Sequence, residues 1–105
     1  MDKRSLEIAR QLKKDIEKNL NVIGMRIFGS RARDDFEEDS DLDIFIELEE
    51  NNPAVRKLID HLSWKIGFEN DLIIMTLIHS KDEVENGIYK YTLIYKSILR
   101  DGIVV

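Results

Sequence analysis

The chain has 105 residues, of which 43% are hydrophobic and 35% are charged, and it contains no cysteine. Its formal net charge of −5 argues against stable nucleic-acid binding, because nucleic-acid-binding domains usually carry an excess of positive charge. The lack of cysteine excludes disulfides and thiolate chemistry. No apolar run approaches the roughly 20 residues that a membrane-spanning helix needs. We therefore expect a single domain over residues 1–105, located in the cytoplasm.

The first half of the chain is predicted to alternate helices and strands. Residues 5–20 repeat apolar side chains at steps of three and four, which is typical of an amphipathic helix. We expect strands at residues 22–28 and 42–48. Between them, residues 31–36 favour a short helix, and residues 37–40 form an acidic loop.

The second half begins with a strong helix signal. Asn52 is a good capping residue and Pro53 suits the first helical position, whereas Gly67 is expected to end this helix. The apolar run Leu72–Met75 is typical of a strand that is covered on both faces. A match to a capping box at Ser80–Glu83 indicates another helix start.

The C-terminal part adds one more helix face. Gly87 is expected to interrupt or kink the helical structure that follows Ser80. Apolar side chains at residues 88–99 then form one face of a helix, and Gly102 is expected to end this helix. Residues 103–105 are either a short terminal strand or a docking tail. The fold class is therefore α/β (α+β): a small sheet of three main strands flanked by about four helices. Periodicity leaves the strand directions open.

Two aspartates at the start of the second predicted strand indicate a metal site. Side chains alternate along a strand, so Asp41 and Asp43 lie on one face, roughly 7 Å apart at their Cα atoms. Placing two like charges side by side in a partly buried position is costly unless a cation neutralises them. The pair therefore predicts binding of divalent cations.

A glycine–serine turn precedes this pair. Gly29 lets a ligand approach the main chain closely, and the first N–H groups of a following helix favour a phosphate. Ser30 adds a hydroxyl donor, and Arg31 and Arg33 add cationic donors for phosphate oxygens. A phosphate site beside a metal site predicts binding of a nucleoside triphosphate.

The spacing of these motifs resembles a known family. Gly29-Ser30, then ten residues, then Asp41-x-Asp43 resembles the Gly-Ser-x10-Asp-x-Asp signature of the polymerase-β-like nucleotidyltransferases. Within them the chain is similar to the minimal nucleotidyltransferases (MNT), the antitoxin partners of HEPN-domain toxins. The resemblance includes the length and the C-terminal SILRDGIVV, and it implies a mixed sheet. Many relatives have glycine where this chain has Asp34.

The resemblance implies a function and a metal site. AMP would pass from ATP to a hydroxyl, a tyrosine of a partner HEPN toxin, and two Mg²⁺ ions would be held by aspartates. A third carboxylate on the next strand completes the metal site in this family. We expect Asp71 to join Asp41 and Asp43 in this role, with Glu69 as the competitor because it would share Asp71's side of the strand.

Two other functions stay open. Because Asp34 replaces the usual glycine, the chain could instead be a binding module with a vestigial nucleotide site, which neutralises its partner by occlusion. The other possibility is an enzyme that acts on a small molecule, such as an aminoglycoside, although the chain shows no second substrate domain.

Overall fold

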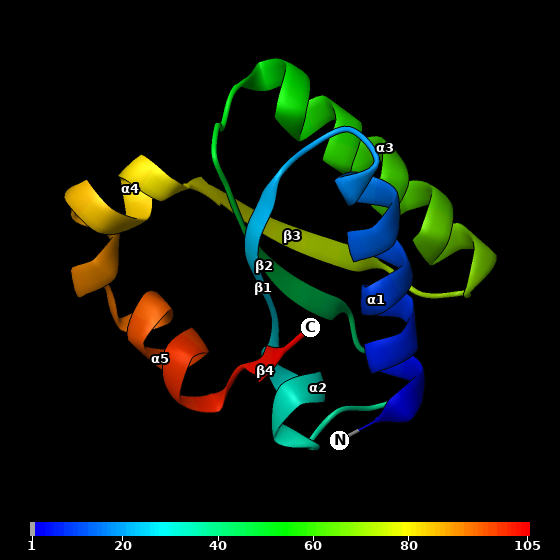
Figure 1. The fold of residues 1–105 in the computed structure, drawn as a ribbon. Helices are drawn as coiled ribbons and strands as arrows, with labels where there is room; N and C mark the ends of the chain where they lie inside the picture. Colours follow the sequence, from blue (N-terminus) through cyan, green and yellow to red (C-terminus); the bar gives the residue numbers. More distant parts are fainter. Residues whose placement is uncertain (1) are drawn as a thin grey trace.

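The computed structural model describes residues 2–105, which form five α-helices, one 3₁₀ turn and a four-stranded sheet (Figure 1). The helices are α1 (Lys3–Glu17), α2 (Ser30–Arg33), α3 (Pro53–Glu69), α4 (Lys81–Asn86) and α5 (Leu93–Asp101), and the 3₁₀ turn η1 is Tyr89–Tyr91. The strands are β1 (Val22–Phe28), β2 (Leu42–Leu48), β3 (Ile74–Ser80) and β4 (Ile103–Val104). Among these described helices, none combines the length and the apolar character needed to cross a membrane.

The sheet is mixed, with the strand order β3-β2-β1-β4. Strand β1 runs antiparallel to both β2 and β4, whereas β2 and β3 are parallel and are connected through α3. A parallel pair needs such a crossover because a tight turn can join only antiparallel neighbours. The mixed α/β fold is confirmed, and the C-terminal segment supplies a fourth strand.

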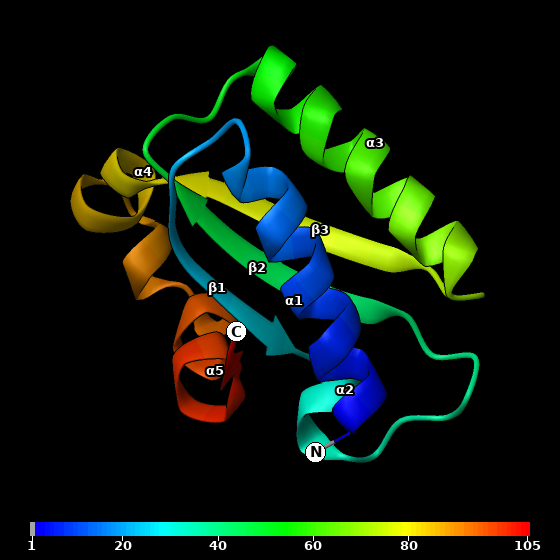
Figure 2. The ribbon, with the colours of Figure 1, turned by 45° about the vertical axis from the view of Figure 1, so that its right-hand side comes forward.

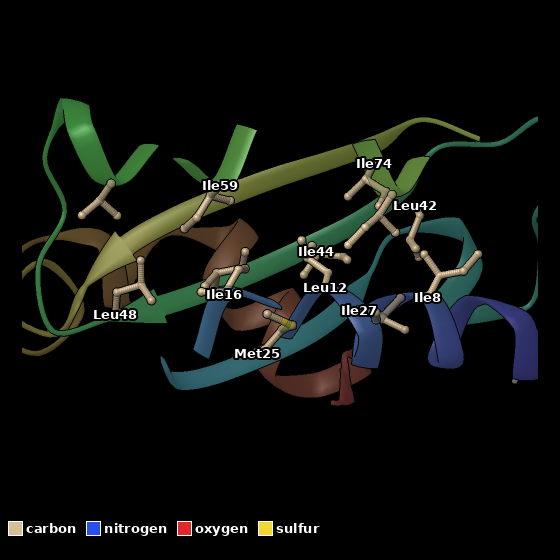
Figure 3. Close-up of a cluster of buried hydrophobic side chains, with 14 residues drawn as sticks. Ile8, Leu12, Ile16, Met25, Ile27, Leu42, Ile44, Leu48, Ile59 and Ile74 are labelled. Carbon is tan, nitrogen blue, oxygen red and sulfur yellow. The ribbon is translucent and has the colours of Figure 1, made fainter. Parts of the chain in front are cut away.

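One face of the sheet is closed by α1 and α3, which lie on the same side of it (Figure 2). Figure 3 shows the side chains of this core, with Ile8, Leu12 and Ile16 of α1 pointing at the strands. From β2, Ile44 and Ile46 reach the same core and are fully buried. We call this the closed face.

Local capping explains where the long helices begin. The Asp2 carboxylate accepts the N–H groups of Arg4 and Ser5 at the start of α1. The Asn52 side chain accepts the N–H of Val55, with Pro53 at the first helical position, as predicted.

The opposite face, which we call the open face, is covered only in part. A smaller cluster of buried apolar side chains joins β2 to α4 and α5 through Phe45, Val84 and Ile98. Ser80 and Glu83 form the predicted capping box at the start of α4. The rest of this face carries the polar side chains described below.

Three predicted boundaries are wrong. Gly67 does not end α3 but lies buried within it, where a Cβ would come within 2.6 Å of the Leu72 carbonyl oxygen. Strand β3 begins at Ile74, two residues later than predicted, because the chain first turns through Asp71 in the left-handed region (φ 57°). The single helix predicted for residues 88–99 is divided into the 3₁₀ turn η1 and the helix α5, because the Thr92 side chain caps the start of α5.

Candidate functional site

Asp41 and Asp43 lie together at the start of β2, on the open face. Asp41 is exposed immediately before the strand, and Asp43 is partly buried within it. Burial raises the pKa of the Asp43 carboxyl, the nearby Asp41 carboxylate raises it further, and Arg33 opposes both effects. The two carboxylates are therefore close enough to repel each other, as the strand alternation predicts.

Gly29, in the turn after β1, lies against the side chain of Asp43. It has φ 73°, a backbone conformation that residues with a side chain rarely adopt, and a Cβ at this position would overlap the Asp43 carboxylate oxygen Oδ2. Phe28, which precedes it, pairs directly with Asp43 across the antiparallel strands. Any larger residue at position 29 would displace Asp43, so glycine keeps the space beside the carboxylates open.

Ser30 and Arg33 lie on the short helix α2 that follows. The Arg33 side chain is 51% exposed and forms an ion pair of 3.2 Å with Asp35. Its effect on the pKa of Asp43 places its charge near the carboxylates. Because α2 has only four residues, we ascribe little of any phosphate binding to a helix dipole.

A hollow of about 220 Å³ adjoins this turn. It is lined by Gly29 and Arg33 on one side and by Ser97 and Asp101 of α5 on the other. Ser97 and Asp101 were missed by sequence reasoning, because nothing in the sequence of α5 indicates that it packs beside a turn nearly 70 residues earlier.

The prediction that Arg31 binds the nucleotide is wrong. Its side chain is buried, with 1% of its surface exposed, and its guanidinium makes five hydrogen bonds within the protein. The acceptors are the Ser40 carbonyl oxygen (3.1 Å from Nε and 2.8 Å from Nη2), the Glu38 carbonyl oxygen (3.2 Å), Asp2 Oδ2 (3.2 Å) and Ser5 Oγ (3.1 Å). A guanidinium has five N–H donors, so these bonds leave none for a phosphate. Arg31 instead fastens the acidic loop and the start of α1 to α2.

The predicted position of Asp71 is also wrong. Asp71 is exposed in the turn between α3 and β3, three residues before the strand begins, so it does not stand on the face that carries Asp43. It lines two other hollows, one beside Trp64 and Phe68 and one beside the acidic loop. Glu69, the alternative third carboxylate, is the last residue of α3. The structure therefore brings together Asp41 and Asp43 but not Asp71 or Glu69.

The residues present fit a divalent cation that is shared with a phosphate. The part of the chain that the structure describes holds no group of three or more histidine, cysteine, aspartate or glutamate side chains able to cage a metal. Mg²⁺, however, is usually bound by one or two carboxylates together with substrate phosphates and water. Asp41 and Asp43 supply such a pair, and the space beside Gly29 admits the other ligands.

Comparison with known proteins agrees with this geometry. A sequence model of the family described as "Nucleotidyltransferase domain" matches residues 9–104, nearly the whole chain. The chain belongs to this family. It is thus a nucleotidyltransferase, and enzymes of the family generally use a nucleoside triphosphate and a divalent metal.

Several relatives have a more specific name. Two proteins of Methanocaldococcus jannaschii, both provisionally named protein adenylyltransferase, are 38% identical over 70% of this chain and 78% of theirs, and 35% identical over 94% of this chain and 92% of theirs. Protein adenylyltransferase MntA of Thermococcus cleftensis is 32% identical over 77% of this chain and 78% of its own length. These names describe the relatives.

A solved structure supports the fold alone. The crystal structure of a protein from Sulfolobus solfataricus, provisionally described as a nucleotidyltransferase, superposes with a TM-score of 0.55 over 96% of this chain and 78% of that chain. The two sequences are 21% identical.

Proposed function

We propose that the chain is an Mg²⁺-dependent protein adenylyltransferase that moves AMP from ATP to a tyrosine of a HEPN-domain toxin and thereby acts as its antitoxin. The observation that carries the proposal is the pairing of Asp41 and Asp43 beside the open turn at Gly29. The names of the relatives support a protein as the acceptor. The proposal places the reaction in the cytoplasm.

The reaction is an in-line displacement at the α-phosphorus of ATP. A bond forms between the acceptor oxygen and this phosphorus, the bond from the phosphorus to the bridging oxygen breaks, and pyrophosphate leaves. The acceptor hydroxyl loses its proton. Mg²⁺, for which two ions are proposed, would offset the charge that accumulates on the phosphate oxygens.

The residues of the chain bind and orient the nucleotide. Asp41 and Asp43 would hold the metal from the open face of β2. Ser30 would donate its hydroxyl to a phosphate oxygen, while Gly29 lets the triphosphate approach the main chain. Arg33, which is half exposed beside Asp43, would steady the negative charge of the phosphates.

Mass spectrometry of the partner tests the proposal. A candidate HEPN-domain partner is incubated with the chain, ATP and Mg²⁺. We expect the partner to gain one or more AMP units on tyrosine, and we expect no gain with the Asp41→Asn or Asp43→Asn variant. Normal transfer by both variants would overturn the assignment of the metal ligands. An unmodified partner that still forms a stable complex would overturn the transfer itself.

One observation favours a second function, in which the chain neutralises its partner by binding alone. The structure brings two carboxylates to the site, and the third that was expected from the resemblance lies elsewhere. The Asp43→Ala variant separates the two functions. An occluding module would still protect cells from the toxin with this variant, whereas loss of protection despite complex formation would exclude occlusion.

A further inference from the structure

Two hollows of the surface adjoin each other, because Asp71 lines both. The first, of about 650 Å³, has Trp64, Phe68 and Ile73 among its walls, and we call it the α3 hollow. The second, of about 710 Å³, lies beside the acidic residues 37–39, and we call it the acidic hollow. Figure 2 shows the loop that follows α2 and the turn between α3 and β3 at the same end of the sheet. The two hollows therefore offer one continuous surface.

The α3 hollow presents large apolar side chains to solvent. Trp64 is 68% exposed and Phe68 is 75% exposed, and their rings stack with centroids 5.5 Å apart. Ile73, in the turn that leads to β3, is also exposed. Scattered apolar residues are common on protein surfaces, but several gathered around one hollow indicate an interaction site. Aromatic side chains of this kind often anchor a protein partner.

A buried hydroxyl in the same hollow lacks a partner. Ser63 lines the α3 hollow and is only 4% exposed. Within residues 2–105, its Oγ makes no hydrogen bond. Leaving a buried polar atom unsatisfied costs free energy, so such atoms usually have partners. A polar group of a bound segment would supply the missing hydrogen bond.

The charge of this surface selects a cationic ligand. Together the two hollows are lined by six carboxylates and two guanidiniums. Both guanidiniums are already engaged within the protein, since Arg31 uses all its donors and Arg4 donates to the Asn70 carbonyl oxygen. Five of the carboxylates form no ion pair with another described residue: Glu37, Glu38, Asp39, Asp60 and Asp71. The surface would repel a nucleotide or a lipid phosphate, and a second copy of this chain is disfavoured by its own charge of −5.

We propose that the two hollows dock a segment of the acceptor protein in which an apolar side chain is followed by two or more arginines. The apolar side chain would pack against Trp64 and Phe68. The first arginine would pair with Asp71 and the next with residues 37–39. Arginine suits this surface because its planar guanidinium stacks on aromatic rings and binds carboxylates with two hydrogen bonds.

The docked segment would lie close to the metal-binding pair. The acidic residues 37–39 end two positions before Asp41 in the chain. A segment held there would keep the rest of the acceptor protein near the site of transfer, which raises its effective concentration. This consequence rests on the proposed function, whereas binding of the segment does not.

Trp64 reports binding directly, because it is the only tryptophan of the chain. The probe is the amidated peptide acetyl-Leu-Arg-Gly-Arg-Arg, and its control carries glutamate in place of each arginine. We expect the basic peptide to move the Trp64 fluorescence to shorter wavelength in a saturable way, since docking shields the ring from water. The acidic peptide should leave the emission unchanged. No saturable change with the basic peptide, or equal changes with both peptides, would overturn the inference.

Two substitutions of equal charge separate local contact from long-range attraction. Asp71→Asn removes a carboxylate at the junction of the hollows, and asparagine tolerates the left-handed backbone of this position. Glu17→Gln removes one from the exposed end of α1, roughly 20 Å along the helix from Arg4. Asp71→Asn should weaken binding of the basic peptide about fivefold, and Glu17→Gln should leave it unchanged. Equal effects of the two variants would overturn the inference.

A transfer assay separates this inference from the proposed function. Both peptides are extended by a Gly-Ser linker and a tyrosine, and each is incubated with wild-type protein, α-labelled ATP and Mg²⁺. We expect the basic peptide to be labelled about tenfold faster at concentrations below its Kd, because docking raises the effective concentration of its tyrosine. Equal labelling of the two peptides would overturn docking of the acceptor. Saturable binding of the basic peptide without labelling of either would support the docking surface and count against the proposed transfer alone.

Discussion

The two faces of the sheet differ in what they bury. On the closed face, Ile44 and Ile46 of β2 are fully buried under α1 and α3. On the open face, the alternate residues Asp43 and Glu47 are partly exposed, and burial raises the pKa of both carboxyls. The same seven-residue strand thus supplies apolar packing on one side and charged chemistry on the other. Stability that is concentrated on one face leaves the other free to hold groups that would destabilise a core.

Arg31 connects the two faces, and its loss should have the largest effect. It joins the start of α1, on the closed face, to the loop that leads to Asp41. Arg31→Met leaves the Asp2 carboxylate without its cation and two carbonyl groups without donors, so we expect a loss of about 3–5 kcal/mol in the free energy of unfolding, measured with urea. The matched control Arg33→Met, at a half-exposed position, should change it by about 0.5 kcal/mol or less. Similar effects of the two variants would contradict the role of Arg31.

Paired truncations on the two faces compare their packing directly. Ile46→Ala removes a fully buried side chain and should cost about 2–5 kcal/mol. Met75→Ala removes a half-exposed side chain and should cost about 0.5 kcal/mol or less. Urea denaturation checks both. If Met75→Ala were as destabilising as Ile46→Ala, the open face would be part of the core.

Glu83, at the edge of the open face, should make the free energy of unfolding depend on pH. Burial raises the pKa of Glu83, but hydrogen bonds from Asn51, Ser80 and His79 outweigh it and lower the pKa to about 2. A folded-state pKa below the ordinary 4.5 adds stability above about pH 4.5, and this stability is lost as the pH falls toward 2. The shift corresponds to roughly 3 kcal/mol, and the 43% exposure of the Glu83 side chain reduces this to about 1 kcal/mol.

The Glu83→Gln variant isolates this contribution. Urea denaturation of wild type and variant at pH 7 and pH 3 should give a difference that is about 0.6 kcal/mol smaller at pH 3, because the rest of the contribution is lost only between pH 3 and pH 2. A difference that is independent of pH would show that the hydrogen bonds to Glu83 do not favour its charged form.

The smallest effect on stability is expected at Asp34, the residue that ends α2. Asp34 has φ 61° in the left-handed region, a backbone conformation that glycine adopts more readily than any residue with a side chain. Asp34→Gly should raise the free energy of unfolding by about 0.5–1 kcal/mol, because it relieves this conformation, and Asp34→Ala should lower it. Thermal unfolding checks both signs. Destabilisation by Asp34→Gly would show that the side-chain interactions of Asp34 outweigh the strain.

Sequence reasoning worked where the information is local. The strands on either side of Gly29, the alternation of Asp41 and Asp43 and the capping box at Ser80 depend on residues that are near one another in the chain. It failed where the answer depends on strand register and on packing between distant segments. The run Leu72–Met75 predicts a strand, but only the pairing with β2 reveals that Met75, rather than Asp71, neighbours Asp43. In the same way, nothing near Arg31 in the sequence shows that its guanidinium will donate hydrogen bonds to Asp2 and Ser5.

One measurement tests the central claim that nucleotide and metal bind on the open face. Amide chemical shifts of the ¹⁵N-labelled chain are followed during titration with Mg²⁺ and the α,β-methylene analogue of ATP. We predict that the largest changes occur at Gly29, Ser30, Arg33, Asp43 and Met75, and that the amides of α3 change little. The alternative location is the hollow of about 650 Å³ beside the exposed, stacked rings of Trp64 and Phe68. Changes centred on that hollow, with Gly29 and Asp43 unaffected, would contradict the account.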